Sequence, residues 1–224
     1  MSATRLVQPA IEYPDSDGQP MADNTLQYQW IETIKGGLDA LFRDRPDVFV
    51  AADHLIYPVH GKPKVRQAPD VYVVFGRPKG HRGSYRVWEE DGLFPQVIFE
   101  VLSPGNGAAE MARKLLFYER YGAEEYYVYD PDRTTFSAYR RRPDGRFDDI
   151  DEPDGYISPR LGVRFDLSGS ELVVRRANGD PLRTYVGEAV RGDEAERRAA
   201  EATAEAARLR NLLRKAGIDP DAAG

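Results

Sequence analysis

Apolar residues recur at helical spacing near the start of the chain. Leu26, Trp30, Ile34 and Leu38 lie four residues apart, which predicts a helix over about 25–43. Asn24 stands directly before it, as a side chain that caps helix N-termini well. The segment 1–23 contains three prolines and an Asp-Ser-Asp-Gly stretch, so it predicts an extended arm with one turn.

Short apolar runs follow and predict β-strands over 48–57, 70–75, 96–103 and 126–129. A second helix is predicted over about 108–121, with Gly122 well suited to end it. From 134 to 186, short β segments alternate with Asp-Gly and Asn-Gly turn signals, as in a β-meander. This order of helices and strands predicts an α/β fold with a mixed sheet.

The C-terminal pattern is different, because seven apolar residues follow a heptad spacing of four and three. They are Ala195, Ala199, Ala202, Ala206, Leu209, Leu213 and Ala216. Two interpretations stay open: a solvated helix leaning on its own domain, or a coiled coil that dimerises the chain. The sequence therefore predicts an arm over 1–23, a main domain over 24–190 and a helical extension over 191–224.

Composition argues against a membrane-spanning, secreted or disulfide-bonded protein. The chain has 224 residues, and its longest apolar run is the five residues Val71–Phe75, too short to span a membrane. The N-terminus lacks the apolar core of a secretory signal. The absence of cysteine excludes disulfides, thiolate zinc sites and cysteine nucleophiles, and it fits the cytoplasm. The three histidines form no close pair, so any protein-bound metal is expected to have oxygen ligands, which suits magnesium or manganese over zinc.

Three charged residues stand where burial is expected. Glu100 interrupts an otherwise apolar strand, and a buried carboxylate needs a cation or a proton. Asp70 opens its strand directly after Pro69, which predicts a position at the edge or at the end of the sheet. Two carboxylates at adjacent strand ends can share one divalent ion. Lys114, which shares a helical stripe with aromatic residues, is the candidate cation beside them.

Each of these residues also has a purely structural interpretation. Asp70 could cap a turn, Glu100 could be a buried salt-bridge partner, and Lys114 could pair with Glu110 at the surface.

Taken in order, these residues match a known pattern. It consists of Ala68-Pro69-Asp70-Val71, then Phe99-Glu100-Val101-Leu102-Ser103-Pro104, then Lys114 with Tyr118, and then Tyr121-Gly122, Glu125-Tyr126 and Asp130-Pro131. The set resembles the Uma-two family, restriction endonucleases within the PD-(D/E)XK nuclease superfamily. The segment Tyr13–Met21 and the alanine- and charge-rich end also look like members of this family, so the resemblance covers essentially the whole chain.

The resemblance implies a restriction-endonuclease-like mixed sheet flanked by helices. It also implies hydrolysis of DNA phosphodiester bonds with Mg²⁺ or Mn²⁺, with Asp70 and Glu100 as metal ligands and Glu32 as a further ligand by superfamily analogy. Leu102 stands where the general motif has a lysine. In this family a lysine of the following helix is thought to fill that role, which points to Lys114. The departure leaves open an inactive module of the same fold that binds nucleic acid or a protein.

A basic run is the candidate DNA-facing segment in a chain whose formal net charge is −6. It contains Arg77, Lys79, Arg82 and Arg86, with Tyr85 and Trp88 beside them. A solvated, charge-rich hairpin is the alternative. A homodimer is expected, because restriction-type nucleases commonly pair two sites and the C-terminal seam offers an interface.

Overall fold

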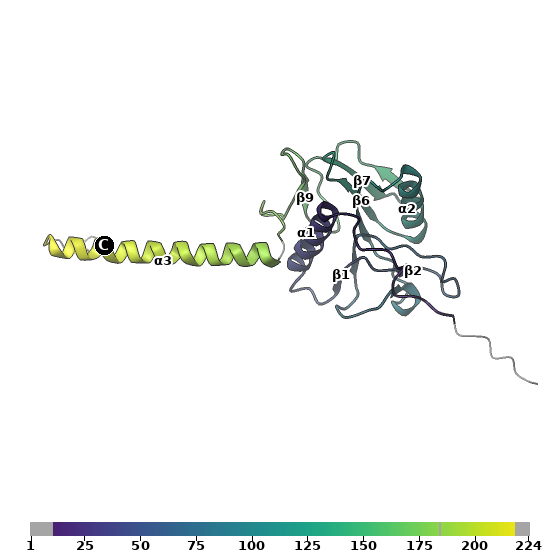
Figure 1. Cartoon of the computed structure of the whole chain (residues 1–224), viewed down its shortest axis with the longest axis horizontal. Coiled ribbons are helices and arrows are strands. Elements are labelled where there is room, and N and C mark those ends of the chain that lie inside the picture. Colours follow the sequence, from purple (N-terminus) through teal and green to yellow (C-terminus); the bar gives the residue numbers. More distant parts are fainter. Residues whose placement is uncertain (1–10, 184, 218–224) are drawn as a thin grey trace, which may run out of the picture. The chain divides into compact units, whose positions relative to one another are not determined.

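The computed structural model describes residues 11–183 and 185–217 (Figure 1). The chain divides into two compact units, Met1–Leu182 and Arg183–Gly224. The last helix begins at Tyr185. Within the described residues, no helix combines the length and apolar character needed to cross a bilayer.

A six-stranded mixed sheet forms the centre of the first unit, in the order β1-β3-β5-β6-β7-β8. The β5 and β6 strands run parallel, and every other neighbouring pair in this sheet is antiparallel. The strands are β1 (Val48–Ala52), β3 (Val71–Phe75), β5 (Val97–Val101), β6 (Glu125–Asp130), β7 (Thr135–Arg141) and β8 (Phe147–Asp149). With the helices described below, this confirms the predicted α/β class and its helical C-terminal extension.

Four short strands lie outside the main sheet. The strand predicted over 48–57 is broken, because Asp53 adopts a left-handed conformation with φ of 45°. Its second part, β2 (Ile56–Tyr57), pairs in parallel with β4 (Tyr85–Arg86), which the short 3-10 helix η1 (Val87–Glu89) follows. The region predicted as one meander is divided: β7 and β8 extend the main sheet, while β9 (Arg164–Asp166) and β10 (Val173–Arg175) pair separately.

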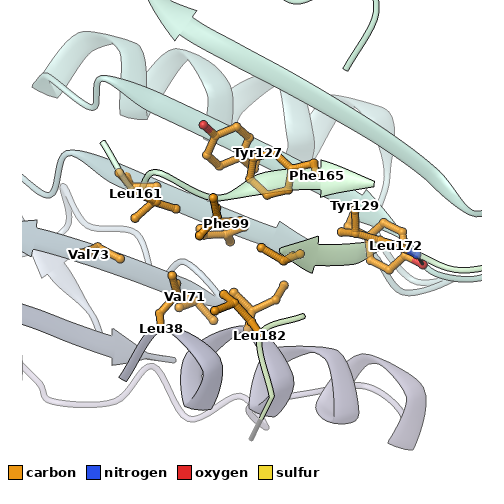
Figure 2. Packing of buried hydrophobic residues seen from close by; sticks show 14 of the residues in the cluster. Leu38, Val71, Val73, Phe99, Tyr127, Tyr129, Leu161, Phe165, Leu172 and Leu182 are labelled. Atoms are coloured by element: carbon orange, nitrogen blue, oxygen red, sulfur yellow. Dashed lines mark hydrogen bonds between the residues drawn. The ribbon is translucent and has the colours of Figure 1, made fainter. Parts of the chain in front are cut away.

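The helix α1 (Thr25–Leu41) covers one face of the sheet. Asn24 caps it, since its side-chain oxygen accepts a hydrogen bond from Gln27 N at 2.8 Å. Figure 2 shows Leu38 of this helix close to Val71 of β3, with Phe99 of β5 in the same layer. Aromatic rings of β6 and β9 complete this core.

The other face packs against α2 (Ala108–Tyr121), which ends at Gly122 with φ of 108°. Side chains of β5 alternate between the two faces, as in any strand. Phe99 and Val101 join the α1 core, and Ile98 joins the α2 core. Glu100 therefore points to the α2 side of the sheet.

The second unit contains α3 (Tyr185–Lys215), a helix of 31 residues. All residues of the predicted heptad seam except Ala216 lie on this helix, and Leu209 and Leu213 are 51% and 38% exposed.

Candidate active site

The register between β3 and β5 brings Asp70 and Glu100 together. Val71 pairs with Phe99 in this antiparallel ladder, so the next pair in register is Asp70 with Glu100. Asp70 precedes the first residue of β3, a central strand, and thus lies at an end of the sheet rather than at its edge. Its Oδ2 accepts a hydrogen bond from Val101 N at 2.6 Å, which fixes the carboxylate beside β5.

The Glu100 carboxylate is 2% exposed and receives hydrogen bonds from two residues of α2. Lys114 Nζ donates to Oε2 at 2.7 Å, and the Tyr118 hydroxyl donates to Oε1 at 2.7 Å. The four-residue spacing of Lys114 and Tyr118 places both on one face of the helix. Lys114 is 12% exposed, so its ammonium points inward to the carboxylates and does not form a surface pair with Glu110.

The three charged groups shift one another's proton affinities. Burial raises the pKa of Glu100, although the Lys114 ammonium and the Tyr118 hydroxyl oppose the shift. Burial and the adjacent Glu100 charge raise the pKa of Asp70 well above its ordinary value. For Lys114, burial works against the charged form, but Glu100 and Asp70 outweigh it and its pKa is raised. One ammonium thus serves two carboxyl groups, and a further cation would relieve their repulsion.

A polar cavity of about 290 Å³ opens beside this cluster. Its walls carry Asp70 and Lys114 together with four further acidic residues: Asp17, Asp23, Asp53 and Glu110. A cavity with this excess of carboxylates suits a hard cation and oxygen ligands.

The comparisons with known proteins decide the family. The family model Uma2, described as "Putative restriction endonuclease", matches residues 8–170. This chain belongs to the Uma2 family. The match includes Asp70, Glu100 and Lys114 and ends before α3.

A solved structure is also similar, a "putative nuclease belonging to DUF820" from Anabaena variabilis ATCC 29413. The sequence identity is 16% and the TM-score 0.49, and the alignment covers 67% of this chain and 82% of that one. No curated protein matches the chain.

Glu32 does not join the cluster in this Uma2 chain. It is exposed on α1, between core residues Ile31 and Ile34, and it is not among the described residues that line the cavity. Gln27 of the same helix does line it. The Gln27 amide donates to the carbonyl oxygen of Val101 at 2.8 Å, next to Glu100.

The basic run is engaged in internal contacts. Arg77 pairs with Asp91, Arg82 with Glu90 and Arg86 with Glu89. Lys79 donates to two backbone carbonyls, those of Phe42 and Arg43. None of the four cations is among the described residues that line the cavity. Only the pair of Arg86 with Glu89 has the short i,i+3 spacing that the sequence could have revealed.

The N-terminal arm contributes more to the site than sequence reasoning expected. The Tyr13 ring packs against Tyr57 and Trp88, at centroid distances of 5.2 and 4.9 Å. The Asp15 carboxylate lies over Gly83, in the space that a Cβ at this position would occupy. The Ser103 hydroxyl donates to Asp23 at 2.5 Å. The arm thereby brings Asp17 and Asp23 to the cavity, and the signals for this were its Asp-Ser-Asp-Gly stretch and the family resemblance of Tyr13–Met21.

The residues present fit a divalent ion in part. Asp70 Oδ1 accepts no hydrogen bond from a described residue, and Glu100 lies next to it. Across residues 11–183 and 185–217, no group of three or more His, Asp or Glu side chains has the arrangement of a metal site. Proteins usually bind Mg²⁺ through one or two carboxylates, while water and a substrate phosphate complete the coordination shell. Asp70 and Glu100 therefore suit an Mg²⁺ or Mn²⁺ ion that binds together with the substrate.

Proposed function

We propose that this Uma2 chain is a metal-dependent endonuclease that hydrolyses DNA phosphodiester bonds. Membership of a family described as "Putative restriction endonuclease" supports a nuclease. The observation that carries the proposal is the Asp70–Glu100–Lys114 cluster beside a polar, acidic cavity. A buried salt bridge would explain why Glu100 and Lys114 lie together. It would not explain why Asp70 is held next to Glu100, where the two carboxylates repel each other.

Each residue has a distinct part in this proposal. Asp70 and Glu100 would hold Mg²⁺ or Mn²⁺, which when bound polarises the phosphoryl oxygen and lowers the pKa of the attacking water. Tyr118 orients the Glu100 carboxylate through its hydroxyl. Lys114 supplies a fixed positive charge next to the reacting phosphate, where charge develops in the transition state.

The test is cleavage of supercoiled plasmid by purified protein with Mg²⁺ or Mn²⁺. Asp70→Asn keeps an oxygen that can accept the Val101 N–H but removes the charge, so the variant should fold and lose about 10³-fold in rate, or ~4 kcal/mol of barrier. Arg142→Ala is the matched control, because Arg142 lies on the exposed β7–β8 hairpin, paired with Asp144. Equal nicking by Asp70→Asn and the wild type would contradict the proposal.

A second candidate is an inactive module of the same fold that binds nucleic acid or a protein. Leu102 at the position of the usual lysine favours it, as do the hydrogen bonds that already occupy both Glu100 oxygens. It predicts that plasmid stays intact with either metal while binding is retained.

We also propose a homodimer that forms through the seam of α3. Glu205 and Arg210 flank the seam, and in a parallel pair of helices such positions lie opposite one another with complementary charge. Leu209→Glu should convert the dimer to a monomer in light scattering. Asn211→Glu, on the outer side of the heptad, should leave the dimer mass unchanged. An unchanged mass for Leu209→Glu would exclude the seam as the interface.

A further inference from the structure

The loop 58–66 leads directly into the candidate active site. Two backbone hydrogen bonds between Ile56 and Gln67, of 2.8 and 3.2 Å, close its base. Gln67 and Ala68 then line the cavity, and Asp70 follows. At the other side of the loop, Gly61 N donates to the Tyr13 hydroxyl at 2.6 Å, which ties the loop to the N-terminal arm. The loop is therefore held at both ends beside the cavity.

Two of the three cations on this loop are not used internally by the described residues, whereas Arg66 donates to the Tyr57 hydroxyl at 3.3 Å. Residues 58–66 include Lys62, Lys64 and Arg66 and no acidic residue. Lys62 and Lys64 are exposed, and their ammonium groups form no hydrogen bond or ion pair with any residue that the structure describes. In the segment 77–86, by contrast, the arginines pair with neighbouring carboxylates. Paired charges cost more to recruit for a ligand, because the existing pair must first be broken.

The same loop also carries an aromatic ring. His60, on the same loop, is exposed, and its ring contacts Trp88 edge-on at a centroid distance of 5.1 Å. Rings next to unpaired cations are typical of surfaces that bind nucleic-acid strands, where rings stack on bases and cations contact phosphates.

The acidic cavity makes such a surface necessary for a polyanionic substrate. A divalent ion at Asp70 and Glu100 offsets charge only locally, while Asp17, Asp23 and Glu110 repel the neighbouring phosphates. We propose that Lys62 and Lys64 bind the phosphate backbone of the substrate strand next to the cavity. This inference rests on the proposed nuclease function and assigns its strand-binding surface to loop 58–66 instead of segment 77–86.

The experiment measures binding of a fluorescein-labelled 20-base-pair DNA by anisotropy, with Ca²⁺ in place of Mg²⁺, over a series of salt concentrations. Lys62→Ala/Lys64→Ala should weaken binding about 10-fold at 0.1 M salt. The slope of log K against log salt should become shallower by about 1.8, because each phosphate contact contributes about 0.9. Lys62→Arg/Lys64→Arg should keep the affinity and the salt slope of the wild type. Arg142→Ala/Arg146→Ala, which removes two exposed arginines from the β7–β8 hairpin, should also leave both unchanged.

The outcomes separate this inference from the proposed function. If the lysine variant binds with the wild-type slope while Asp70→Asn still loses plasmid cleavage, the nuclease proposal stands and the loop assignment is wrong. The loop assignment is also wrong if the hairpin control loses as much affinity as the lysine variant. If the wild type neither binds DNA nor cuts plasmid, both proposals fail.

Discussion

Glu100 and Glu125 are both 2% exposed and lie on adjacent parallel strands, yet their surroundings differ. Glu100 faces α2, where it pairs with the Lys114 ammonium beside a second carboxylate and an open cavity. Glu125 lies at the start of β6 and accepts hydrogen bonds from Ser158 Oγ, the Tyr127 hydroxyl and Arg160 N. Its partners lie on β6 and in the segment 158–160, so the carboxylate anchors that segment to the sheet.

The two residues contrast the buried acid of the proposed metal site with a buried acid that anchors a segment of the fold. Three neutral donors satisfy Glu125, and among the described residues no other acid accepts from these donor atoms. Repulsion from the neighbouring Glu124 adds to the rise that burial causes in the pKa of Glu125. Glu100 shares its one cation with Asp70, an arrangement that stability alone does not favour, because like charges repel at close range. The remaining repulsion at Glu100 is what a bound cation would remove.

Removing the Lys114 ammonium should have the largest effect on stability. Lys114→Ala leaves the buried Glu100 charge uncompensated, and we expect a loss of about 3–5 kcal/mol in the free energy of unfolding. Urea denaturation measures it. Lys35→Ala, which breaks a half-buried i,i+4 pair with Asp39 on α1, should cost only about 0.3–0.5 kcal/mol. Equal losses would show that the Glu100 pair is no more than a surface-type contact.

Removing the Tyr118 hydroxyl, which donates to Glu100, should have the next largest effect on stability. Tyr118→Phe removes a hydrogen bond to a buried charged group and should cost about 1.5–3 kcal/mol. Tyr126→Phe is the matched control, since the buried Tyr126 hydroxyl has no hydrogen-bond partner among the described residues. The control should be as stable as the wild type or more so. A loss in Tyr126→Phe as large as in Tyr118→Phe would assign the effect to packing.

The smallest effect concerns the pH dependence of Glu125. Burial raises its pKa above the ordinary value of 4.5, although hydrogen bonds from Ser158, Tyr127 and Arg160 oppose the shift. The folded state then holds more protons than the unfolded state just above pH 4.5. The wild type therefore loses stability relative to Glu125→Gln as pH rises through this window. Urea midpoints at several pH values measure the difference, and a gain with rising pH would have the wrong sign.

Part of this site follows from local patterns in the sequence. The proline before Asp70 indicated a residue at the edge or end of the sheet, and the lone acid Glu100 inside an apolar strand indicated a buried charge. The four-residue spacing of Lys114 and Tyr118 indicated that both lie on one face of a helix. The structure brings these residues together through the β3–β5 register and α2.

Other parts depend on contacts between distant segments, which a periodic pattern does not encode. The left-handed Asp53 breaks a run that looked like one strand, and it lies at the cavity only because its N–H donates to the carbonyl of Asp70. Glu125 looked like one residue of a family motif, and its anchoring role appears only when the segment 158–160 folds over it. Glu32 was chosen by analogy, whereas the helix turns Gln27 toward the cavity.

The proposed metal site is tested most sharply by calorimetric titration with Mn²⁺ of the wild type, Asp70→Asn, Glu100→Gln and Glu125→Gln. We predict that the wild type and Glu125→Gln bind Mn²⁺ alike, and that Asp70→Asn and Glu100→Gln lose this binding. Mn²⁺ binding that survives in Asp70→Asn and Glu100→Gln, or that is lost equally in Glu125→Gln, would contradict a metal site at Asp70 and Glu100.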